Sequence, residues 1–478
     1  MKCYITYLLL LFSLAGHAQN WQYIDSLSAW PNPKFMYVDT LQDRLYLGGA
    51  FEDNNGQIMS QLFYYDGYKT HNIDTLSLPR QPGRTLCMTR YKGELYVGGD
   101  FFNLGKTYTR TNSLAKMDHD TFVTVNPIQH GIGNWSIYDM VEYKGKLILG
   151  FSGDSMGGVK SRGIVSYDGS NYESLGGGVL HNDDSPSINS LSVYKDRLYA
   201  AGSFYVKIGT SFDYTTSNFQ VWDEGSQQWG IVDGWKGGHF AFINEMIEYK
   251  GDLYLMGRFK TNDNAIANDI VRFDGTYFYS VGKGCGMAQI YNAVVYNDEL
   301  YVCGPFREMD GMVANGLAKW NGKRWCTISK DVFLYSSQIP RLEDIAFYHD
   351  TLFVYGGFNH INSDSIKTLA KWVGDSSMTD FCASPAKQDT ANYNLSVESL
   401  VSHNPNWKVF PNPAQRIITL ELENLNSKKE VKVIDASGRK VIWGVVQQPI
   451  STLNLEGLNP GIYILQIEGY GSKRILVN

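Results

Sequence analysis

One phrase recurs seven times along the chain, and this internal repeat constrains the fold more than any other feature of the sequence. Each copy holds an aromatic residue, a short polar turn and a version of Leu-Tyr-Val-Gly-Gly-x-Phe, as in Tyr91–Phe101 and Tyr296–Phe306. The anchor leucines of the copies, 47 to 55 residues apart, are Leu45, Leu95, Leu147, Leu198, Leu253, Leu300 and Leu352. Repeats of this length bury their apolar side chains only against their neighbours, so the copies are expected to stack.

The pattern within each copy predicts four antiparallel β-strands. The residue four before the anchor is Tyr in six copies and Leu41 in the first, and we expect it to end the innermost strand. A Lys-Gly, Lys-Asp, Asn-Asp or His-Asp pair then makes a tight hairpin turn. Glycine follows the anchor by four residues in six copies, where a missing side chain permits a bulge or close strand approach. Turns such as Tyr65–Gly67 join the third strand to the fourth.

The two ends of the repeat array complement each other. The seventh copy runs to Trp372 and then loses the pattern, so its outermost strand is missing. Residues Asn20–Leu27 stand before the first copy and have the character of that missing strand. We therefore expect them to pair into the last copy, which would close the array into a circle and remove two exposed sheet edges.

These repeats resemble the kelch and galactose-oxidase-like propellers over about three-quarters of the chain. The resemblance implies an all-β, seven-bladed β-propeller spanning residues 19–380. It implies a fold more firmly than a function, because propellers host many unrelated activities. The copper chemistry of galactose oxidase is not carried over, because the required set of tyrosine and histidine ligands is not found in this sequence. No cofactor, metal ligand or catalytic residue is assigned.

The N-terminus has the features of a secretory signal peptide over residues 1–18. Lys2 supplies positive charge, an apolar stretch follows, and a small-x-small pattern places cleavage between Ala18 and Gln19. No later stretch reaches the ~18 apolar residues of a membrane span. The net charge of −6 argues against a nucleic-acid partner, since binding phosphates requires a basic surface.

The last part of the chain differs from the repeats in composition and charge. Residues 381–404 lose the aromatic period and are expected to form a linker. Residues 405–478 alternate apolar and polar side chains, as at Ile417–Glu423, which predicts a small Ig-like β-sandwich. This segment has nine Lys/Arg and six Asp/Glu, or +3, which leaves −9 for the remainder of the chain. The two parts are therefore expected to be separate modules.

This segment resembles the type A C-terminal sorting domain of cargo carried by the bacterial type IX secretion system. The residues that match its motifs are Pro411, Asn412, Pro413, Gly438, Arg439, Gly461, Tyr463, Lys473 and Arg474. The resemblance implies Sec export in a Gram-negative bacterium, handling by the type IX machinery, removal of the tail, and release or surface attachment. The plainer interpretation is that Pro-Asn-Pro and Asn-Pro-Gly only make turns in an ordinary sandwich.

Candidate reactive groups are few. Five cysteines follow the signal, Cys87, Cys285, Cys303, Cys326 and Cys382, and without CxxC spacing they indicate buried thiols with one or two disulfides of unassigned pairing. Gly153–Gly157 spells G-x-S-x-G around Ser155, but it falls in a connecting loop of a β-repeat. The stretches 53–56 and 262–264 hint at calcium ligands, but neither is followed by the bidentate Glu of an EF-hand loop, and turn chemistry explains them better.

Three functions are compatible with these features. The leading hypothesis is a surface or secreted protein that binds a glycan or protein partner through loops on one propeller face. The alternative is a hydrolase or lyase acting on polysaccharide, and the third is a spacer in a surface layer. Convergent carboxylates with a histidine or metal in the channel would favour the enzyme, and exposed aromatic residues around one channel mouth would favour binding.

Overall fold

The computed structural model divides the chain into two compact units, Met1–Ala391 and Asn392–Asn478. All regular structure in the described residues is β-strand. Among those residues no helix is long and apolar enough to span a membrane. The structure describes residues 20–24, 32–52, 58–73, 83–101, 103–104, 109–110, 113–125, 136–180, 186–208, 211–213, 218–235, 237, 241–260, 268–286, 288–328, 331–334, 342–374, 381–384, 407–423, 425, 427–435, 440–468 and 470–478.

Among the described residues, the first unit contains seven antiparallel sheets of four or five strands, numbered here in chain order, besides shorter two-stranded ribbons. Sheet 1 holds β2 (Asn32–Asp39), β3 (Arg44–Glu52), β4 (Ile58–Tyr65) and β5 (Thr70–Asn72). Sheet 2 holds β6 (Arg84–Tyr91), β7 (Glu94–Asp100), β10 (Leu114–Asp118) and β11 (Thr121–Thr124). Sheet 3 holds β12 (Ile137–Tyr143), β13 (Lys146–Phe151), β16 (Ile164–Tyr167) and β17 (Tyr172–Ser174). Sheet 4 holds β18 (Ser187–Tyr194), β19 (Arg197–Ser203), β22 (Phe219–Asp223) and β23 (Gln228–Ile231).

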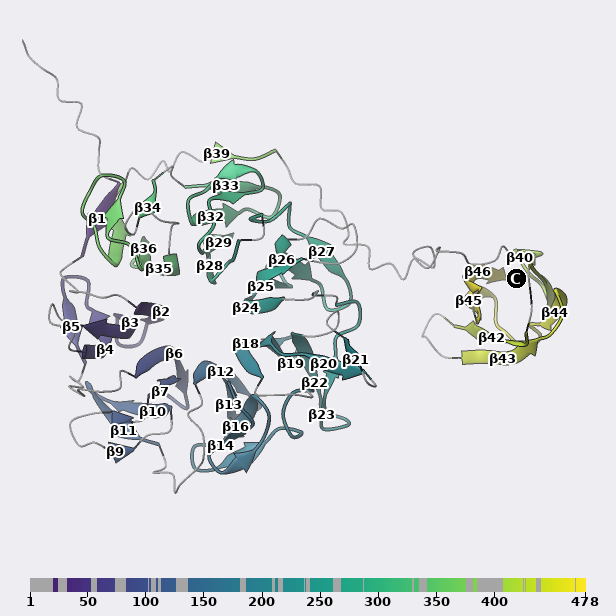
Figure 1. Ribbon diagram of the computed structural model, residues 1–478, viewed down its shortest axis with the longest axis horizontal. Coiled ribbons are helices and arrows are strands. Elements are labelled where there is room, and N and C mark those ends of the chain that lie inside the picture. Colours follow the sequence, from purple (N-terminus) through teal and green to yellow (C-terminus); the bar gives the residue numbers. More distant parts are fainter. Residues whose placement is uncertain are drawn as a thin grey trace, which may run out of the picture. The chain divides into compact units, whose positions relative to one another are not determined.

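The remaining sheets repeat this order, and Figure 1 shows their first strands nearest a common centre. Sheet 5 holds β24 (Phe242–Tyr249), β25 (Asp252–Lys260), β26 (Asn268–Phe273) and β27 (Phe278–Ser280). Sheet 6 holds β28 (Asn292–Tyr296), β29 (Glu299–Cys303), β32 (Leu317–Trp320), β33 (Trp325–Thr327) and β39 (Phe381–Cys382). Sheet 7 holds β35 (Leu342–Tyr348), β36 (Thr351–Gly356), β38 (Leu369–Trp372) and β1 (Trp21–Tyr23).

The predicted pairing of the N-terminal segment with the last repeat is confirmed. β1 lies antiparallel to β38, with Trp21 opposite Trp372 and Tyr23 opposite Ala370. The Trp21 side chain is buried, packs edge-on against Phe333, and donates a hydrogen bond from Nε1 to Asp331 at 3.0 Å. The first strand of the chain therefore completes its last four-stranded sheet.

Short two-stranded ribbons extend from one end of the sheets. Four of them interrupt the connection between the second and third strands of a sheet, and the fifth joins the connections around sheet 7. They pair β8 (Asn103–Leu104) with β9 (Thr109–Arg110), β14 (Ser155–Met156) with β15 (Val159–Lys160), β20 (Val206–Ile208) with β21 (Ser211–Asp213), β30 (Glu308–Met309) with β31 (Met312–Val313), and β34 (Phe333–Leu334) with β37 (His360–Ile361). We call this the ribbon end, and the opposite end the turn end.

The repeated residues have the structural roles that their types predict. The six tyrosines end the first strands of sheets 2 to 7, and residues of the following turns, such as Lys92 and Gly93, have positive φ. At Gly202 an added Cβ would lie 2.0 Å from the carbonyl oxygen of Ser187, so only glycine allows this close approach of strands. The first copy differs from the prediction. β2 ends at Asp39, and Leu41 lies in the turn with 75% of its surface exposed.

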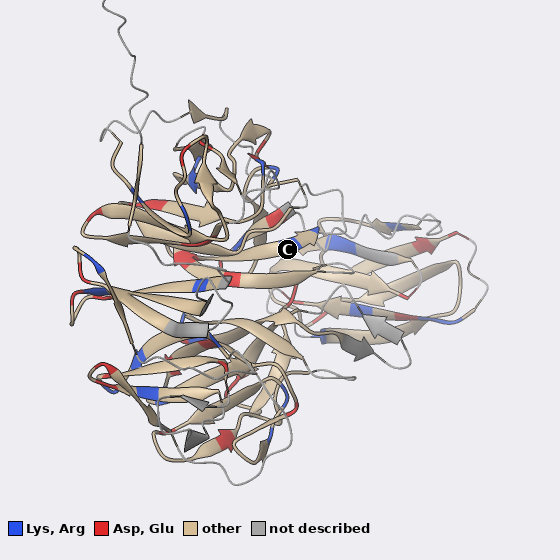
Figure 2. Ribbon diagram, turned by 60° about the vertical axis from the view of Figure 1, so that its left-hand side comes forward, with Lys and Arg blue, Asp and Glu red and all other residues tan. Residues whose placement is uncertain are grey.

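Apolar cores lie between neighbouring sheets. One buried cluster combines Tyr46 of sheet 1 with Met88 and Val97 of sheet 2. Another combines Phe353 of sheet 7 with Leu45 of sheet 1. Charged side chains occur mainly toward strand ends and turns (Figure 2), which leaves the sheet faces free to pack together. Each repeat therefore buries its apolar residues against the next one, and sheet 7 does so against sheet 1.

Tyrosine hydroxyl groups connect neighbouring sheets at the turn end. Each strand-ending tyrosine donates a hydrogen bond to the hairpin turn of the following sheet. The six bonds are Tyr91 to Gly145 O (2.8 Å), Tyr143 to Asp196 O (3.5 Å), Tyr194 to Gly251 O (3.0 Å), Tyr249 to Asp298 O (2.8 Å), Tyr296 to an Asp350 carboxylate oxygen (2.9 Å) and Tyr348 to Asp43 O (2.9 Å). The last of these joins sheet 7 to sheet 1.

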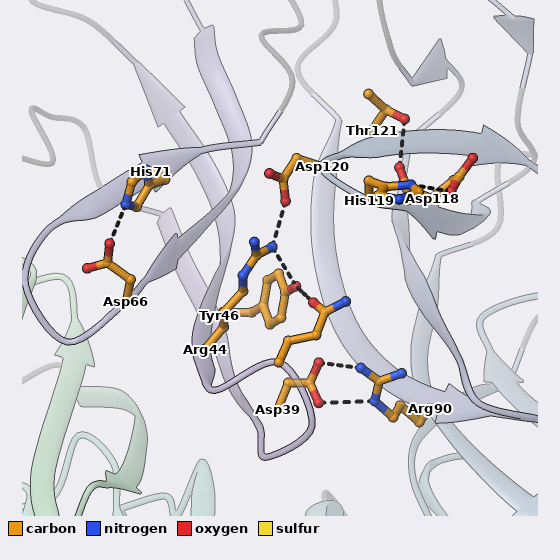
Figure 3. Close-up of polar contacts among 11 residues, drawn as sticks. Asp39, Arg44, Tyr46, Asp66, His71, Arg90, Asp118, His119, Asp120 and Thr121 are labelled. Carbon is orange, nitrogen blue, oxygen red and sulfur yellow. Dashed lines mark hydrogen bonds and ion pairs between the residues drawn. The ribbon is translucent and has the colours of Figure 1, made fainter.

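The junction between sheets 1 and 2 lacks this tyrosine and uses ion pairs instead (Figure 3). The Asp39 carboxylate receives hydrogen bonds from Arg90, one of them 3.0 Å long from Nε. The Arg44 guanidinium lies 2.6 Å from Asp120 of sheet 2 and also covers the Tyr64 ring at 4.0 Å. Charged contacts thus replace the tyrosine bond at the one junction where the repeat has Leu41.

A disulfide holds the last strand of the first unit. Cys326 in β33 is bonded to Cys382 in β39, and Cys87, Cys285 and Cys303 are free, buried thiols. This agrees with the expectation of buried thiols and one or two disulfides. Phe381 and Cys382 fall within the stretch expected to be linker, yet they form a fifth strand of sheet 6.

The second unit is a two-sheet β structure. One sheet holds β40 (Trp407–Phe410), β41 (Ile417–Leu422) and β44 (Ile450–Asn454). The other holds, in spatial order, β43 (Lys440–Val446), β42 (Lys429–Ile434), β45 (Gly461–Ile467) and β46 (Gly471–Val477). Their inward side chains, including Leu420, Val433 and Leu465, form one buried cluster.

Candidate functional site

The first strands of the sheets share a β-bulge near the ribbon end. In six sheets the pairing with the second strand shifts by one residue at the same step, for example between Ile137 and Asp139 and between Ile243 and Glu245. A bulge changes the direction of the side chains beside it. The residue that follows the bulge is Phe35, Cys87, Asp139, Ser190, Glu245 or Asp344.

Three carboxylates occupy this position, in sheets 3, 5 and 7. Burial raises the pKa of Glu245 well above its usual range, and the charges of Asp139 and Asp344 raise it further. These sheets are not neighbours in the chain order, and Figure 1 shows their first strands on the side of each sheet nearest a common centre. Asp139, Glu245 and Asp344 are called the central carboxylates below.

Two central carboxylates also accept hydrogen bonds from the first strand of the next sheet. Asp139 accepts hydrogen bonds from the backbone N–H groups of Met140 (2.7 Å) and Leu191 of sheet 4 (2.6 Å). Asp344 accepts from Ile345 (2.6 Å) and from Met36 of sheet 1. The Ser190 hydroxyl accepts a bond from Met246 at 3.0 Å in the same manner. This position therefore connects first strands at three junctions, between sheets 3 and 4, sheets 4 and 5, and sheets 7 and 1.

Burial dominates the acidity of both aspartates. It raises the pKa of Asp139 to about 6 and that of Asp344 to about 8, although the backbone N–H donors act in the opposite direction. Both oxygens of each carboxylate already accept hydrogen bonds within the protein. These two side chains are consequently occupied by structural contacts.

Five of the six bulged residues, all except Leu86 of sheet 2, form a polar set one step closer to the ribbon end. Lys34 of sheet 1 and Glu343 of sheet 7 form an ion pair of 3.5 Å. Asn189 donates to Ile243 O at 3.1 Å, and Asn244 donates to Ile290 O at 2.7 Å. Tyr138 is the bulged residue of sheet 3 and is half-buried. Lys34, Tyr138, Asn189, Asn244 and Glu343 are called the polar rim.

The chemistry available here is hydrogen bonding, aromatic contact and acid–base exchange. Within the described residues, no three His, Cys, Asp or Glu side chains are grouped closely enough to hold a metal ion. None of the first strands carries a histidine. Three carboxylates thus share one position of the repeat, and the described first strands bring no histidine to them.

Other sequence candidates lie elsewhere. Ser155 is in the β14–β15 ribbon, where its hydroxyl donates to Asp154 at 3.0 Å, and no strand-to-helix turn surrounds it. Ala18, Gln19, Gly438 and Arg439 lie outside the described residues, as do the acidic stretches 53–56 and 262–264.

The repeat contained a signal for the central carboxylates that the sequence analysis missed. Each of the three residues stands eight positions before its anchor leucine: Asp139 before Leu147, Glu245 before Leu253, and Asp344 before Leu352. Aligning the copies on their anchors would have shown acidic residues at this position in three of seven copies.

In the second unit, the Pro-Asn-Pro motif lies along the edge strand β46. Asn412 donates from Nδ2 to Arg474 O at 3.0 Å and accepts from Leu476 N–H at 2.8 Å. Ala414 continues the contact through backbone bonds to Leu476 and Asn478. The side chain of Asn412 thus substitutes for a neighbouring strand on the backbone of β46.

The other described motif residues flank the same strand. Tyr463 in β45 is buried, and its hydroxyl donates to Asn459 O at 2.8 Å, which ties the Asn-Pro-Gly turn to the sheet. Lys473 donates to Trp407 O at 2.7 Å, and its Nζ lies 5.0 Å from the Trp407 ring. Arg474 is exposed.

Residues 408–478 match the family described as "Secretion system C-terminal sorting domain". The second unit is a type IX sorting domain. Its presence marks the chain as cargo that the type IX machinery of a Gram-negative bacterium exports to the cell surface or the medium. The predicted sorting domain is therefore confirmed. The contacts of Asn412 and Tyr463 show how two residues of the predicted motifs are held in this unit.

Solved structures resemble the whole chain at low identity. The extracellular domain of BT4673 from B. thetaiotaomicron, described as a hybrid two-component system, is 12% identical with a TM-score of 0.46. The match covers 96% of this chain and 58% of that one, so this chain spans little more than half of that domain.

Two further structures are similar at the same level. PorZ, described as a surface component of the type IX secretion system of Porphyromonas gingivalis, is 12% identical with a TM-score of 0.36, covering 91% of this chain and 68% of that one. A fungal alcohol oxidase of the AA5 family, in complex with copper, is 12% identical with a TM-score of 0.39, covering 95% and 100%. None of the curated proteins matches this sequence.

Proposed function

We propose that the first unit is a seven-bladed, kelch-like β-propeller that binds a glycan or protein partner at the ribbon end of its axis. The propeller is supported by seven four-stranded repeats, by β1 as the outer strand of sheet 7, and by the Tyr348 bond from sheet 7 to sheet 1. In this arrangement the central carboxylates line the propeller axis and the ribbons surround one mouth of its channel.

The polar rim is the observation that carries the binding proposal. It places tyrosine, asparagine and one ion pair at equivalent steps of neighbouring repeats, near the end where the connections are long. Such side chains provide a stacking surface and paired donors and acceptors, which suits the hydroxyl groups of a sugar. The turn end consists instead of tight hairpin turns joined to each other by tyrosines and lysines.

The binding proposal is tested with the mature full-length chain on a glycan array, followed by calorimetry with the best glycan. We expect Tyr138→Ala to weaken binding at least tenfold. Tyr68→Ala is the matched control, because Tyr68 is a tyrosine of a turn-end hairpin with 93% of its surface exposed. Equal affinity of the Tyr138 variant and the wild type, both folded, would place the ligand elsewhere.

The central carboxylates favour a second candidate, a hydrolase or lyase acting on polysaccharide. A carboxylic acid whose pKa is raised toward neutrality is suited to act as a general acid. Glu245 is the best candidate, because the oxygens of Asp139 and Asp344 are held by backbone N–H groups. Release of new reducing ends or unsaturated products, abolished in Glu245→Gln, would establish catalysis. Binding of an intact glycan without products supports the leading proposal.

The processing of the chain follows from the same proposal. We propose that signal removal between Ala18 and Gln19 leaves Trp21 close to the new N-terminus, free to join sheet 7. We also propose that the propeller begins at residue 19 and that the connection to the sorting domain follows Cys382. Mass spectrometry of the exported protein would identify both ends.

A further inference from the structure

The sorting domain carries a continuous apolar area on the outer face of its four-stranded sheet. Ile462 is directly opposite Leu476, and their side chains are 53% and 39% exposed. Ile464 is 36% exposed and lies between Ile434 of β42 and Arg474 of β46. These five residues, called the β45–β46 patch, bring large apolar side chains together beside Arg474, and the exposed Lys440 borders them opposite Ile434. Grouped exposed apolar residues mark interaction sites more reliably than single ones.

The other sheet of the sorting domain provides an internal comparison. It also exposes large apolar residues, but each has a polar residue directly opposite. Phe410 faces Thr419, Ile417 faces Asn454, and Ile450 faces Glu421. The apolar residues of that sheet are therefore separated from each other, whereas those of the β45–β46 patch pair across the strands.

The edge beside the patch is closed to strand addition. The contacts of Asn412 and Ala414 occupy backbone groups of Arg474, Leu476 and Asn478 along β46. Pro411 and Pro413 have no N–H groups to offer a further strand. A partner that approaches β46 must therefore bind side chains on the face of the sheet.

The charge of the patch indicates what the partner offers. Arg474 is exposed at the side of Ile464, and among the described residues no carboxylate forms an ion pair with it. An arginine bordered by apolar side chains is a common centre of a protein interface, where it pairs with a carboxylate of the partner. The partner surface that fits is apolar with one acidic group.

We propose that a protein of the type IX export machinery binds the sorting domain at the β45–β46 patch, with an apolar surface and a carboxylate directed at Arg474. The occupant follows from the role of this unit, because a sorting domain must be bound by the machinery that exports it. Arg474 supports the choice, since it belongs to a sorting motif and lies within the patch. This inference is independent of the ligand of the propeller.

The test compares two double variants of the full chain in the native secreting bacterium. Ile464→Ser with Arg474→Glu alters the patch. Ile417→Ser with Ile450→Ser removes two isoleucines from the other sheet that are more exposed than Ile464, at 54% and 64% against 36%. Surface and medium protein is measured by protease accessibility and immunoblotting, and periplasmic protein by fractionation. We expect the patch variant to lose at least tenfold in export and to accumulate in the periplasm, while the control is exported like the wild type.

Two further measurements keep the result interpretable. Thermal unfolding of the purified variants shows whether a loss of export comes from lost binding or from lost folding. The single variant Arg474→Glu leaves the apolar residues unchanged and should still reduce export. Normal export of the folded patch variant would overturn the proposal, as would an equal loss in the control. A change in oligomeric state that accompanies the loss would instead assign the patch to self-association, and would also overturn it.

Discussion

Six junctions of the repeat unit use a tyrosine hydroxyl to reach the next sheet, whereas the junction between sheets 1 and 2 uses Asp39–Arg90 and Arg44–Asp120. The same connection is therefore made by two kinds of chemistry. A neutral hydroxyl bond to a carbonyl contributes about 1 kcal/mol to stability. A buried ion pair leaves an unpaired charge when one partner is removed. The junction that departs from the repeat should be the more sensitive to single substitutions.

The largest effect is expected where sheet 7 depends on the N-terminal strand. Trp21→Ala removes a buried indole that packs against Phe333 and Trp372. The free energy of unfolding should fall by about 3–5 kcal/mol, as for other buried aromatic truncations. Urea unfolding followed by tryptophan fluorescence measures the loss, with Trp443→Ala in the sorting domain, where the indole is 60% exposed, as the control.

At the ion-paired junction, Asp39→Ala should lower the free energy of unfolding by about 3 kcal/mol, because Arg90 loses its partner in a partly buried site. Asp39 also accepts a bond from Leu41 N–H at 3.0 Å, which the substitution removes. The same unfolding assay applies. If the loss is no larger than that caused by a tyrosine substitution at another junction, the ion-paired junction is not the more sensitive one.

The pH dependence of stability should reveal the central carboxylates, which join first strands at other junctions. Their folded pKa values lie above the ordinary value near 4, at about 6 for Asp139 and about 8 for Asp344. Between pH 4 and pH 8 the folded chain keeps protons on these carboxylates that the unfolded chain has already released. The stability of the folded chain is therefore highest at low pH and falls as the pH rises from 4 to 8. The loss should be on the order of 5 kcal/mol between pH 5 and pH 8, most of it from Asp344.

The variant Asp344→Asn tests the source of this slope. It should be less stable than the wild type at pH 5, because an amide N–H₂ would meet a backbone N–H of Met36 or Ile345. Its stability should nevertheless change less with pH. An unchanged slope would assign the pH dependence to other groups.

The smallest effect is expected at a tyrosine junction. Tyr249→Phe keeps the buried ring and removes the hydrogen bond to Asp298 O. The free energy of unfolding should therefore fall by about 1 kcal/mol. Tyr279→Phe is a useful control, because the Tyr279 hydroxyl bonds only within its own sheet, to Asp274. A cost of 3 kcal/mol or more for Tyr249→Phe would remove the distinction between the junctions.

The sequence contained enough information for the strands but not for the charged contacts. The positions of Tyr91, Leu95 and Gly99 repeat, so their roles in strand, turn and close approach could be predicted from pattern and residue type. The pairing of Trp21 with Trp372 was predictable because both ends of the array were incomplete. In contrast, Asp39 and Arg90 are 51 residues apart and belong to no repeated motif, so only the folded chain brings them together.

Contacts between residues far apart in the sequence were equally unpredictable in the sorting domain and at the central carboxylates. The Pro-Asn-Pro motif was visible in the sequence, but its contact with β46 was not, because Asn412 and Arg474 are 62 residues apart. The central carboxylates come from three copies, and their convergence depends on how the sheets are arranged. Residue spacing alone carries no information on which side of a β-bulge a side chain lies.

The central claim is that β1 completes sheet 7 in the register that places Gln22 opposite Lys371. The direct test introduces Gln22→Cys with Lys371→Cys, oxidises the folded protein and maps the cross-link by mass spectrometry. Gln22→Cys with Ala370→Cys is the control, since Ala370 is one residue out of register and points to the other face of the sheet. A bond in the first variant only is the predicted result; reactive free thiols at both positions in the folded protein would contradict the account.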